Sequence, residues 1–255
     1  MLLTGCLGRK LTYHPPDLAT PSPPPAPFAE IPLETREGRI VAWWRAPGTG
    51  EPVVLFFYGN GSSLEACRRG GLLDRIAACG AGIFSPDYPG YGNSAGTPSE
   101  GAIARAADAA VAWLRAEHPG SPLVVMGQSL GAGVAVGTAC RHRDAVAGLV
   151  LLAPFTSLAD AARAHYPGWL VRLALRERYD SAAVIPGFAK PALVIHGADD
   201  PVIPVAQGRA LSALARPTSR FVEIPGAAHN DLTEFPGVWD EIRRFVRELA
   251  IPRDR

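Results

Sequence analysis

Short apolar runs rich in β-branched residues alternate, from residue 31 onward, with longer stretches of helical periodicity. This alternation is typical of parallel strands joined by crossover helices. We expect strands, the first two forming a hairpin, at residues 31–35, 39–45, 53–58, 82–85, 123–127, 148–153, 192–196 and 220–224. The expected helices cover residues 63–78, 99–117, 130–142, 158–175, 205–215 and 237–250. The pattern therefore predicts an α/β fold built on a mostly parallel, doubly wound sheet of eight strands with flanking helices.

The stretch before this pattern has a different composition. Prolines cluster at positions 15–16 and again between 21 and 27, and such clusters favour extended polyproline conformations over packed structure. A chain of 255 residues fits one α/β core, so we divide it into an N-terminal arm at 1–27 and a single domain at 28–255. The arm is interpreted either as a stiff tether or as a segment lying along the domain surface.

Residues 3–6 read Leu-Thr-Gly-Cys, which resembles a bacterial lipobox, the motif whose cysteine is lipidated after signal-peptide cleavage. The basic and long apolar regions of a signal peptide do not precede it, so the match is either the end of a longer precursor's signal or a coincidence. A lipid on Cys6 would attach the protein to a membrane of the bacterial envelope, with residues 7–27 as the tether. Without that lipid we expect a cytoplasmic protein.

The charge balance bears on possible partners. The chain has 25 basic and 24 acidic residues spread along its length, for a formal net charge of +1. Nucleic-acid binding needs a concentrated basic surface, so nucleic acid is not expected as a partner. No apolar run approaches the ~20 residues that a membrane-spanning helix requires. The oligomeric state is not predicted.

The pentapeptide Gly127-Gln128-Ser129-Leu130-Gly131 carries the strongest chemical signal. It follows a predicted strand and opens a helix of small residues, which is the context in which G-x-S-x-G forms a nucleophile elbow. Glycine at both ends leaves room for the sharp turn, and the helix N-terminus points at negative charge developing on a substrate carbonyl. We therefore predict that Ser129 is a catalytic nucleophile.

A serine hydroxyl needs a neighbouring imidazole to accept its proton. His229 lies in the loop after the last predicted strand, at the same edge of the sheet as Ser129, and is the predicted base. The five other histidines lie in the arm, at helix ends, in a helical insertion and at the end of a strand: His14, His118, His142, His165 and His196.

The acid that orients the base is expected between serine and histidine in chain order. Asp200 satisfies this, because it lies just past a predicted strand in a G-x-x-D-x-x-I-P segment. Asp199 is its direct competitor, and we favour Asp200. Asp87, after another strand, is interpreted as a residue that shapes its loop.

Two backbone amides are the candidates for an oxyanion hole. The loop after the strand at 53–58 is rich in glycine and exposes its N–H groups, as does the turn after Ser129. We assign the hole to the amides of Asn60 and Leu130. This chemistry requires neither a cofactor nor a metal, so none is expected.

Together these segments resemble the small, nearly capless α/β-hydrolase-domain proteins, a family that includes bacterial hydrolases and eukaryotic protein depalmitoylases. The resemblance spans residues 28–250. It rests on FYGNG at 57–61, PDYPGYGNS at 86–94, GQSLG at 127–131, APFTSL at 153–158, HG at 196–197 with Asp200, and HND at 229–231. The family usually has histidine where this chain has Tyr58, which we expect to reshape the wall of the site while leaving the hole intact.

The resemblance implies an α/β-hydrolase fold with a minimal lid, and a serine hydrolase that cleaves small-molecule or lipid acyl esters or thioesters. The insertion at 158–190 has room for only one or two short helices, so we expect an open site. A peptidase of the same fold would need a larger cap. An inactive binding or scaffold module of the same fold is the alternative from a different class.

Overall fold

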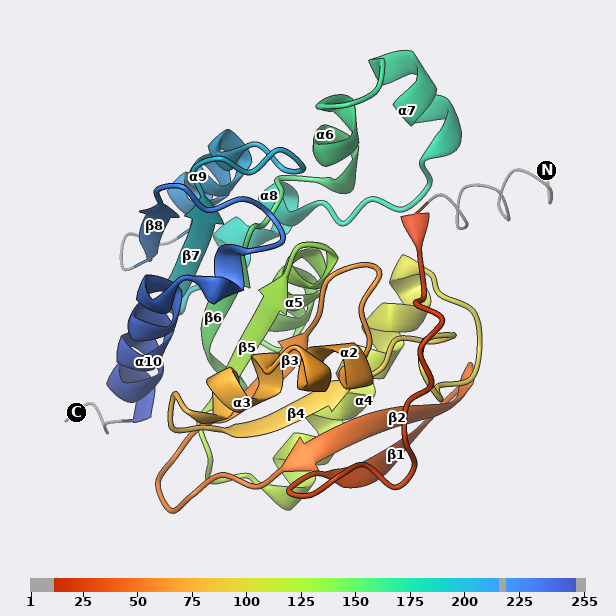
Figure 1. The fold of residues 1–255 in the computed structure, drawn as a ribbon, viewed down its shortest axis with the longest axis vertical. Helices are drawn as coiled ribbons and strands as arrows, with labels where there is room; N and C mark the ends of the chain where they lie inside the picture. The colour runs from red at the N-terminus through yellow and green to blue at the C-terminus, as the bar shows by residue number, and fades with distance from the viewer. Residues whose placement is uncertain (1–11, 216–218, 251–255) are drawn as a thin grey trace.

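The computed structural model describes residues 12–215 and 219–250, with an eight-stranded sheet at its centre (Figure 1). The strands are β1 (Ala29–Thr35), β2 (Gly38–Arg45), β3 (Val53–Phe57), β4 (Gly82–Pro86), β5 (Leu123–Gln128), β6 (Val146–Leu152), β7 (Ala192–Gly197) and β8 (Arg220–Ile224). All eight predicted strands are confirmed, and no bound is shifted by more than two residues.

The order of strands across the sheet is β1-β2-β4-β3-β5-β6-β7-β8. β2 pairs antiparallel with both β1 and β4, and every pair from β4 to β8 is parallel. The chain moves outward from β3 to β4 and then returns to β5 on the other side of β3. Ligands of open α/β sheets bind outside the carboxyl ends of the strands at such a reversal. The topology therefore singles out the loops that follow β3 and β5.

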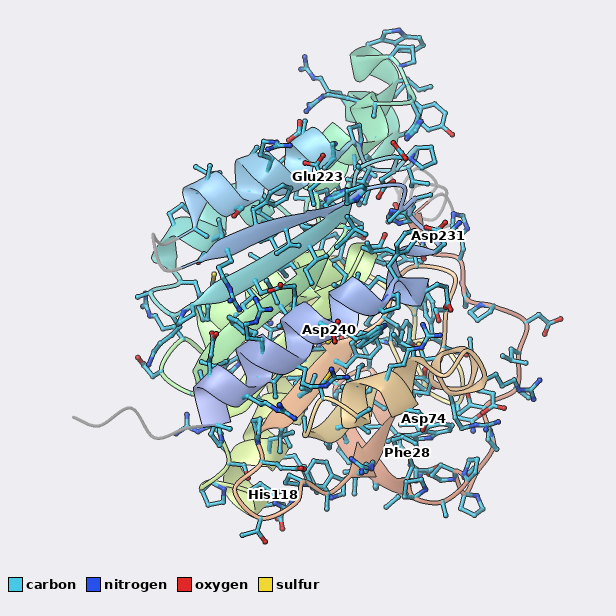
Figure 2. All side chains as sticks on the ribbon, turned by 60° about the vertical axis from the view of Figure 1, so that its left-hand side comes forward. Phe28, Asp74, His118, Glu223, Asp231 and Asp240 are labelled. Atoms are coloured by element: carbon cyan, nitrogen blue, oxygen red, sulfur yellow. The ribbon has the colours of Figure 1, made fainter. Side chains whose placement is uncertain are left out.

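Helices cover both faces of the sheet. One face carries α4 (Glu100–Glu117), α5 (Leu130–Arg141), α8 (Ser181–Val184) and α9 (Val205–Leu214), which contact one another in sequence. The other carries α2 (Leu64–Arg69), α3 (Leu72–Ala77) and α10 (Pro236–Ala250). Figure 2 shows α10 crossing this second face, with Asp240 on it and Asp74 on the neighbouring α3. This is the doubly wound α/β arrangement that the sequence predicted.

The burial of the strands follows from this layering. Every residue of β3, β4 and β7 is buried, because helices cover both of their faces. These strands consequently read as continuous apolar runs with no alternation. The edge strand β1 is mostly exposed or half-buried, with Leu33 as its single buried residue.

Two predicted helices are each divided in the structure. The expected helix at 63–78 is split into α2 and α3 by Gly70 and Gly71, and Gly71 adopts a left-handed φ of 71°. The expected helix at 158–175 is split into α6 (Leu158–Arg163) and α7 (Gly168–Ala174). Pro167 caps α7 and has no amide hydrogen with which to continue a helix from α6. The insertion after β6 ends with α8 and the short 3-10 helix η1 (Ile185–Gly187).

The described part of the N-terminal arm, residues 12–27, lies against the domain (Figure 1). The Tyr13 side chain is buried, and its hydroxyl is 2.8 Å from the hydroxyl of Tyr179. Further along, the Asn93 side-chain amide donates to the Thr20 carbonyl at 2.7 Å. Cys6 and the lipobox resemblance lie outside the described residues.

Within the described ranges, none of the helices has both the length and the apolar character needed to cross a bilayer. The same residues contain no cluster of three or more histidine, cysteine, aspartate or glutamate side chains arranged to hold a metal ion.

Candidate functional site

The turn between β5 and α5 holds Ser129 in a strained backbone conformation. Its φ and ψ angles are 53° and −118°, a combination that residues with a side chain rarely adopt. A Cβ atom on Gly127 would lie 2.1 Å from the carbonyl oxygen of Gly131, and one on Gly131 would lie 2.1 Å from that of Phe57. No larger residue fits at either glycine without moving the backbone. The sharp turn at Ser129 therefore requires glycine at both 127 and 131.

Ser129, His229 and Asp200 form a chain of hydrogen bonds. His229 Nε2 lies 3.0 Å from Ser129 Oγ, and His229 Nδ1 lies 2.7 Å from Asp200 Oδ2. The three residues follow β5, β8 and β7 respectively, so loops at one edge of a parallel sheet bring together side chains that are distant in sequence. The structure therefore places all three predicted site residues in contact.

Asp200 is held by contacts on both of its carboxylate oxygens. Oδ1 accepts hydrogen bonds from the amides of Val202 and Ile203, each at 2.8 Å, and Oδ2 faces the two imidazoles of His229 and His196. Burial acts to raise the pKa of this carboxyl, but the hydrogen bonds from His196, His229 and the Ile203 amide hold its pKa well below the usual range. Asp200 is therefore ionised throughout the neutral pH range.

Asp199 occupies a different environment although it is the adjacent residue. Its side chain is exposed, and its backbone amide donates to the carbonyl of Ala227 at 3.0 Å. Among the described residues, no hydrogen bond or ion pair joins the Asp199 side chain to His229. The geometry therefore favours Asp200 as the partner of the imidazole.

His196 is a part of the site that the sequence did not identify. It is fully buried at the end of β7, with Nε2 2.9 Å from the carbonyl oxygen of Ile203 and 3.3 Å from Asp200 Oδ2. Both neighbours are acceptors, so Nε2 carries the proton. Its Nδ1 has no hydrogen-bond partner among the described residues. The only signal for this role was its place four residues before Asp200, at a strand end.

The loop that carries His229 is braced by a short side-chain contact. Asp231 Oδ1 accepts a hydrogen bond from the amide of Ala228 at 2.7 Å. This closes the turn 228–231 around His229, whose side chain is nearly buried. In Figure 2, Asp231 marks this loop on the right of the view, and His118 lies far from it at the bottom.

The two amides expected to bind an oxyanion both border Ser129. Asn60 and Leu130 line the same cavity as Ser129 and His229. The preceding residue, Gly59, packs so closely that a Cβ on it would lie 3.5 Å from the Cβ of Ser129. Neither amide has a backbone hydrogen-bond acceptor among the described residues. Both amides remain the predicted donors of the oxyanion hole.

The Asn60 side chain is fixed by three hydrogen bonds that the sequence did not predict. Its Nδ2 donates to the Thr12 carbonyl at 2.7 Å, and its Oδ1 accepts from the His14 amide at 3.0 Å and from the Tyr91 hydroxyl at 2.9 Å. The loop after β3 is thereby tied to the N-terminal arm. Nothing in the local sequence of the loop indicated a partner so distant along the chain.

Tyr58 points away from the site, contrary to the expectation that it reshapes the wall. It is fully buried, and its hydroxyl donates to Asp87 Oδ1 at 2.8 Å. Asp87 Oδ1 also accepts from the Leu64 amide at the start of α2. Burial raises the pKa of Asp87 to about 6, with the hydrogen bonds from Tyr58 and the Leu64 amide acting in the opposite direction. Asp87 therefore shapes its loop, as the sequence suggested.

A cavity of about 410 Å³ opens above Ser129. Apart from the site residues, its walls are mainly apolar side chains from the loop after β6, from α6, and from the loop that carries Asp200. These walls include Phe155, Leu158, Ala161, Ala162, Leu175, Val202 and Ile203. Thr12 and His165 complete the rim. This volume lies within the range of small-molecule sites.

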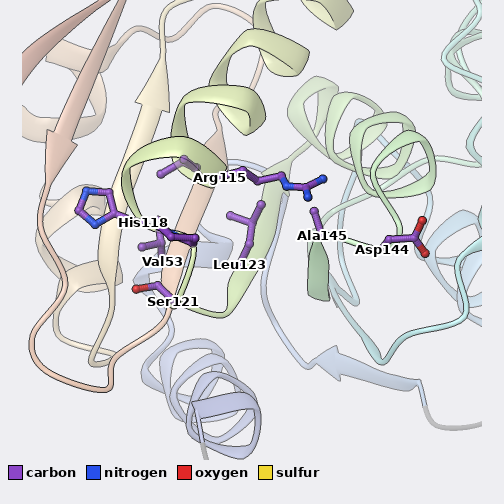
Figure 3. A pocket seen from close by; sticks show the side chains of 9 residues that line it. Val53, Arg115, His118, Ser121, Leu123, Asp144 and Ala145 are labelled. Carbon is purple, nitrogen blue, oxygen red and sulfur yellow. The ribbon is translucent and has the colours of Figure 1, made fainter.

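A second cavity, of about 270 Å³, lies at the opposite edge of the sheet (Figure 3). Val53, Leu123 and Ala145 line it at the amino ends of β3, β5 and β6, together with Arg115 and His118 from the end of α4. It contains none of the residues in the Ser129 chain of hydrogen bonds. The predicted catalytic residues therefore lie at the other edge of the sheet, beyond the carboxyl ends of the strands.

Comparison with known proteins identifies relatives along most of the chain. An uncharacterized protein of Mycobacterium tuberculosis is 36% identical over 256 residues, covering 95% of this chain and 88% of the relative. The lysophosphatidylserine lipase ABHD12 of Rattus norvegicus is 28% identical over 240 residues. That match covers 84% of this chain but only 59% of the lipase, so the chain spans little more than half of that relative.

Solved structures share the fold. The esterase Pf2001 of Pyrococcus furiosus superimposes with a TM-score of 0.75 over 93% of this chain and 100% of the esterase, at 20% sequence identity. The esterase Est1E of Butyrivibrio proteoclasticus, with ferulic acid bound, superimposes with a TM-score of 0.71 over 86% of this chain and 98% of the esterase, at 18% identity.

A family model described as the alpha/beta hydrolase fold matches residues 52–188, a span that includes the Ser129 turn and ends before Asp200. The match covers 137 of the 255 residues, which is more than half of the chain. With the sheet order, the strained serine turn and the relatives in agreement, this chain belongs to the α/β-hydrolase family.

Proposed function

We propose that this protein is a serine hydrolase of acyl esters, with Ser129 as nucleophile, His229 as base and Asp200 as the orienting acid. The observation that carries the proposal is the hydrogen-bonded chain from Ser129 Oγ through both nitrogens of His229 to Asp200 Oδ2. A nucleophile, a base within reach of it and a carboxylate that fixes the base are the three parts this chemistry needs.

In the first half of the reaction, Ser129 Oγ attacks the ester carbonyl while His229 Nε2 takes the serine proton. Asp200 accepts the hydrogen bond from Nδ1, which fixes the tautomer and stabilises the imidazolium. The amides of Asn60 and Leu130 donate to the oxyanion of the tetrahedral intermediate. The C–O bond of the ester then breaks, and His229 gives the proton to the departing alcohol.

The second half repeats these steps with water. His229 takes a proton from a water molecule as its oxygen attacks the acyl carbon bound to Ser129. Collapse of the second tetrahedral intermediate breaks the bond to Oγ, returns the proton to serine and releases the carboxylic acid. The enzyme is restored without a cofactor.

The apolar walls of the cavity are suited to bind the acyl chain of an ester substrate. The cavity offers aliphatic and aromatic side chains beside Ser129 and only a few polar groups. The similarity to a lysophosphatidylserine lipase and to esterase structures supports a lipid-like ester. Thioesters present the same carbonyl to Ser129, so they are the second bond class to assay.

The proposal is tested by steady-state hydrolysis of p-nitrophenyl esters and matched acyl thioesters of increasing chain length. We expect kcat/KM to rise by up to about fourfold per added methylene over the first few carbons, because each buried methylene contributes about 0.8 kcal/mol. His229→Ala should remove nearly all of this activity. A folded protein that cleaves peptides and no ester, or cleaves nothing, would contradict the proposal in favour of a peptidase or a binding module.

A further inference from the structure

The insertion after β6 exposes large apolar side chains at its tip. Tyr166, Trp169 and Leu173 have relative exposures of 59%, 70% and 76%. They are three of the six large hydrophobic residues exposed in the described parts of the chain. Single exposed apolar side chains are ordinary, but a group of exposed large apolar side chains on one short segment is typical of an interaction site.

This tip has little packing of its own to explain its sequence. α6 has no buried residue, and Val171 is the single buried residue of α7. Figure 1 shows α7 projecting beyond the body of the fold. The three exposed side chains therefore face solvent from a short helix and the turn before it.

Arginines dominate the charged side chains of the same segment. Between residues 163 and 178, the exposed charged side chains are Arg163, Arg172, Arg176 and Arg178, and the one carboxylate of the segment, Glu177, is half-buried. Because the whole chain has a net charge of only +1, four arginines with one carboxylate are a local concentration of positive charge, and exposed Asp180 follows two residues later.

Each carboxylate in or beside this segment makes a contact, and one of them pairs with an arginine of the segment. Asp160 is half-buried and pairs with Arg163 at 2.6 Å, and half-buried Glu177 accepts a hydrogen bond from the Glu100 amide. Asp180, just beyond the segment, caps α8 through the Ala183 amide. Arg172 has no ion-pair partner among the described residues. Between residues 160 and 180, arginines outnumber carboxylates by four to three, so the surface around the tip has a small excess of positive charge.

The tip stands at the mouth of the Ser129 cavity. Residues of the insertion line the cavity. Among them, Ala161 and Ala162 lie just before the tip, and His165 and Leu175 lie within it. Thr12, where the described chain begins, lies on the same rim. A surface that held the tip would lie directly against the entrance used by an acyl chain.

We propose that the insertion tip, residues 163–178, docks the protein on an anionic lipid surface. Trp169, Tyr166 and Leu173 would lie at the boundary of headgroups and acyl chains, and the arginines would contact the anionic headgroups. Docking then places the cavity entrance at the bilayer, from which an acyl ester enters. The delivery of substrate rests on the proposed function, whereas docking itself does not require catalysis.

The experiment measures flotation of the protein with phosphatidylcholine vesicles and with vesicles in which about one third of the lipid is phosphatidylglycerol. Every protein carries Cys6→Ser, so that no lipid on residue 6 supplies the binding. The test variants are the double change Trp169→Ser with Leu173→Ser, and Arg172→Gln. The matched controls are Leu214→Ser, an exposed leucine on α9, and Arg143→Gln, an exposed arginine after α5.

We expect binding to anionic vesicles that weakens with salt and falls at least tenfold in the double variant. Arg172→Gln should weaken binding about fivefold on anionic vesicles only, since one arginine near such a surface contributes about 1 kcal/mol. The controls should bind like the parent protein. All variants should keep their hydrolysis of a soluble short-chain ester, because none of the changed residues lines the Ser129 cavity.

Vesicle binding that is absent, or that the double variant retains, would overturn the proposal. Sedimentation velocity on the same proteins provides a further decisive outcome. A dimer that the double variant dissociates, without vesicle binding, would show that the tip is an interface between copies of this chain. If the parent protein hydrolyses the ester but does not bind vesicles, only the docking surface is rejected. If the parent protein binds vesicles but does not hydrolyse the ester, only the proposed function is rejected.

Discussion

Asp200 and Asp199 are adjacent residues of the same type in opposite environments. One carboxylate is buried against two imidazoles and two backbone amides, and the other is exposed. The difference arises because the backbone at 199 pairs with Ala227 while the next side chain turns inward towards His229. The same substitution at exposed Asp199 is therefore a matched control for removing the buried charge of Asp200.

Asp200→Asn should lower kcat by about 10²- to 10⁴-fold, because a neutral amide neither stabilises the imidazolium nor fixes the His229 tautomer. Asp199→Asn should change kcat by less than about threefold, since an exposed charge outside the contact adds little. Steady-state kinetics on a soluble ester measures both. A larger loss in the Asp199 variant would reject the assignment of the acid.

Asp87 offers a test of burial at a single residue. Because burial raises the pKa of Asp87 to about 6 from its ordinary value of 3.8, folding takes up a proton in the interval between these values. The free energy of unfolding contributed by Asp87 therefore falls as the pH rises through about 6. The neutral Asn side chain keeps an oxygen for Tyr58 and the Leu64 amide and lacks this titration.

The parent protein should lose about 2 kcal/mol of its free energy of unfolding between pH 4.5 and pH 8 through Asp87, and Asp87→Asn should not show this loss. The free energy of unfolding of the variant should therefore rise by about 2 kcal/mol relative to that of the parent over this interval. Urea unfolding of both proteins at the two pH values gives the difference. Equal pH dependence in the two proteins would show that Asp87 does not titrate in this range.

Single residues were predictable from sequence where a motif and its structural context coincide. Ser129 lies between glycines at a strand-to-helix turn, so its placement followed from local geometry. His196 and the side chain of Asn60 were not identified, because their partners are defined only when separate loops meet. Tyr58 was expected at the wall of the site, but the buried carboxylate of Asp87 holds it away.

At the scale of elements, the loop after β3 depends on the arm. The Asn60 side chain makes three hydrogen bonds, two of them with residues 12–14: it donates to the Thr12 carbonyl and accepts from the His14 amide and the Tyr91 hydroxyl. These bonds hold the loop that borders Ser129. The arm also bonds to Asn93, farther from the site, through the Thr20 carbonyl. Asn60 lies in the loop and contacts the arm, whereas Asn93 contacts the arm away from this loop. A comparison of variants at the two residues therefore distinguishes positioning of the loop from attachment of the arm.

Asn60→Ala should lower kcat about tenfold or more with little change in KM, because the loop loses its restraints while its backbone amide remains. Asn93→Ala removes one bond to the arm and should leave kcat within about twofold of the parent. Kinetics on the same ester measures both. Equal effects in the two variants would indicate that the Asn60 contacts only attach the arm.

Two predicted helices were wrong because each is interrupted by a residue that ends one helix and begins the next. Apolar periodicity continues across residues 63–78 and 158–175, so both ranges read as single helices. Gly71 with its positive φ and Pro167 without an amide hydrogen break them. Both residues were visible in the sequence, but a single glycine or proline inside a periodic stretch does not by itself fix the break.

At the scale of the whole molecule, the sheet was predictable because each parallel strand is a short apolar run bounded by turns. The placement of the site followed, since the carboxyl ends of neighbouring parallel strands share one edge. The docking of residues 12–27 and the projection of the insertion were not predictable, because both depend on contacts between segments far apart in the chain.

The uneven packing of the molecule predicts where it opens first. Residues 163–169 are all exposed, and α6 and α7 together bury one side chain, so local unfolding of this segment should be easier than that of the sheet. Within residues 28–250, trypsin under native conditions should therefore cut first after Arg163, Arg172 or Arg176. Mass spectrometry of early fragments identifies the site. An earlier cut in α4, α5 or α10 would contradict this order.

Covalent labelling by a fluorophosphonate reports which residue of the folded protein is the nucleophile, and we propose that it is Ser129. We expect one phosphonyl adduct, mapped by mass spectrometry to the peptide that contains Ser129. Ser129→Ala should remove the adduct and keep the fold, and Ser62→Ala, in the loop after β3, should be labelled like the parent. An adduct on another residue, or labelling that persists in Ser129→Ala, would exclude Ser129 as the nucleophile.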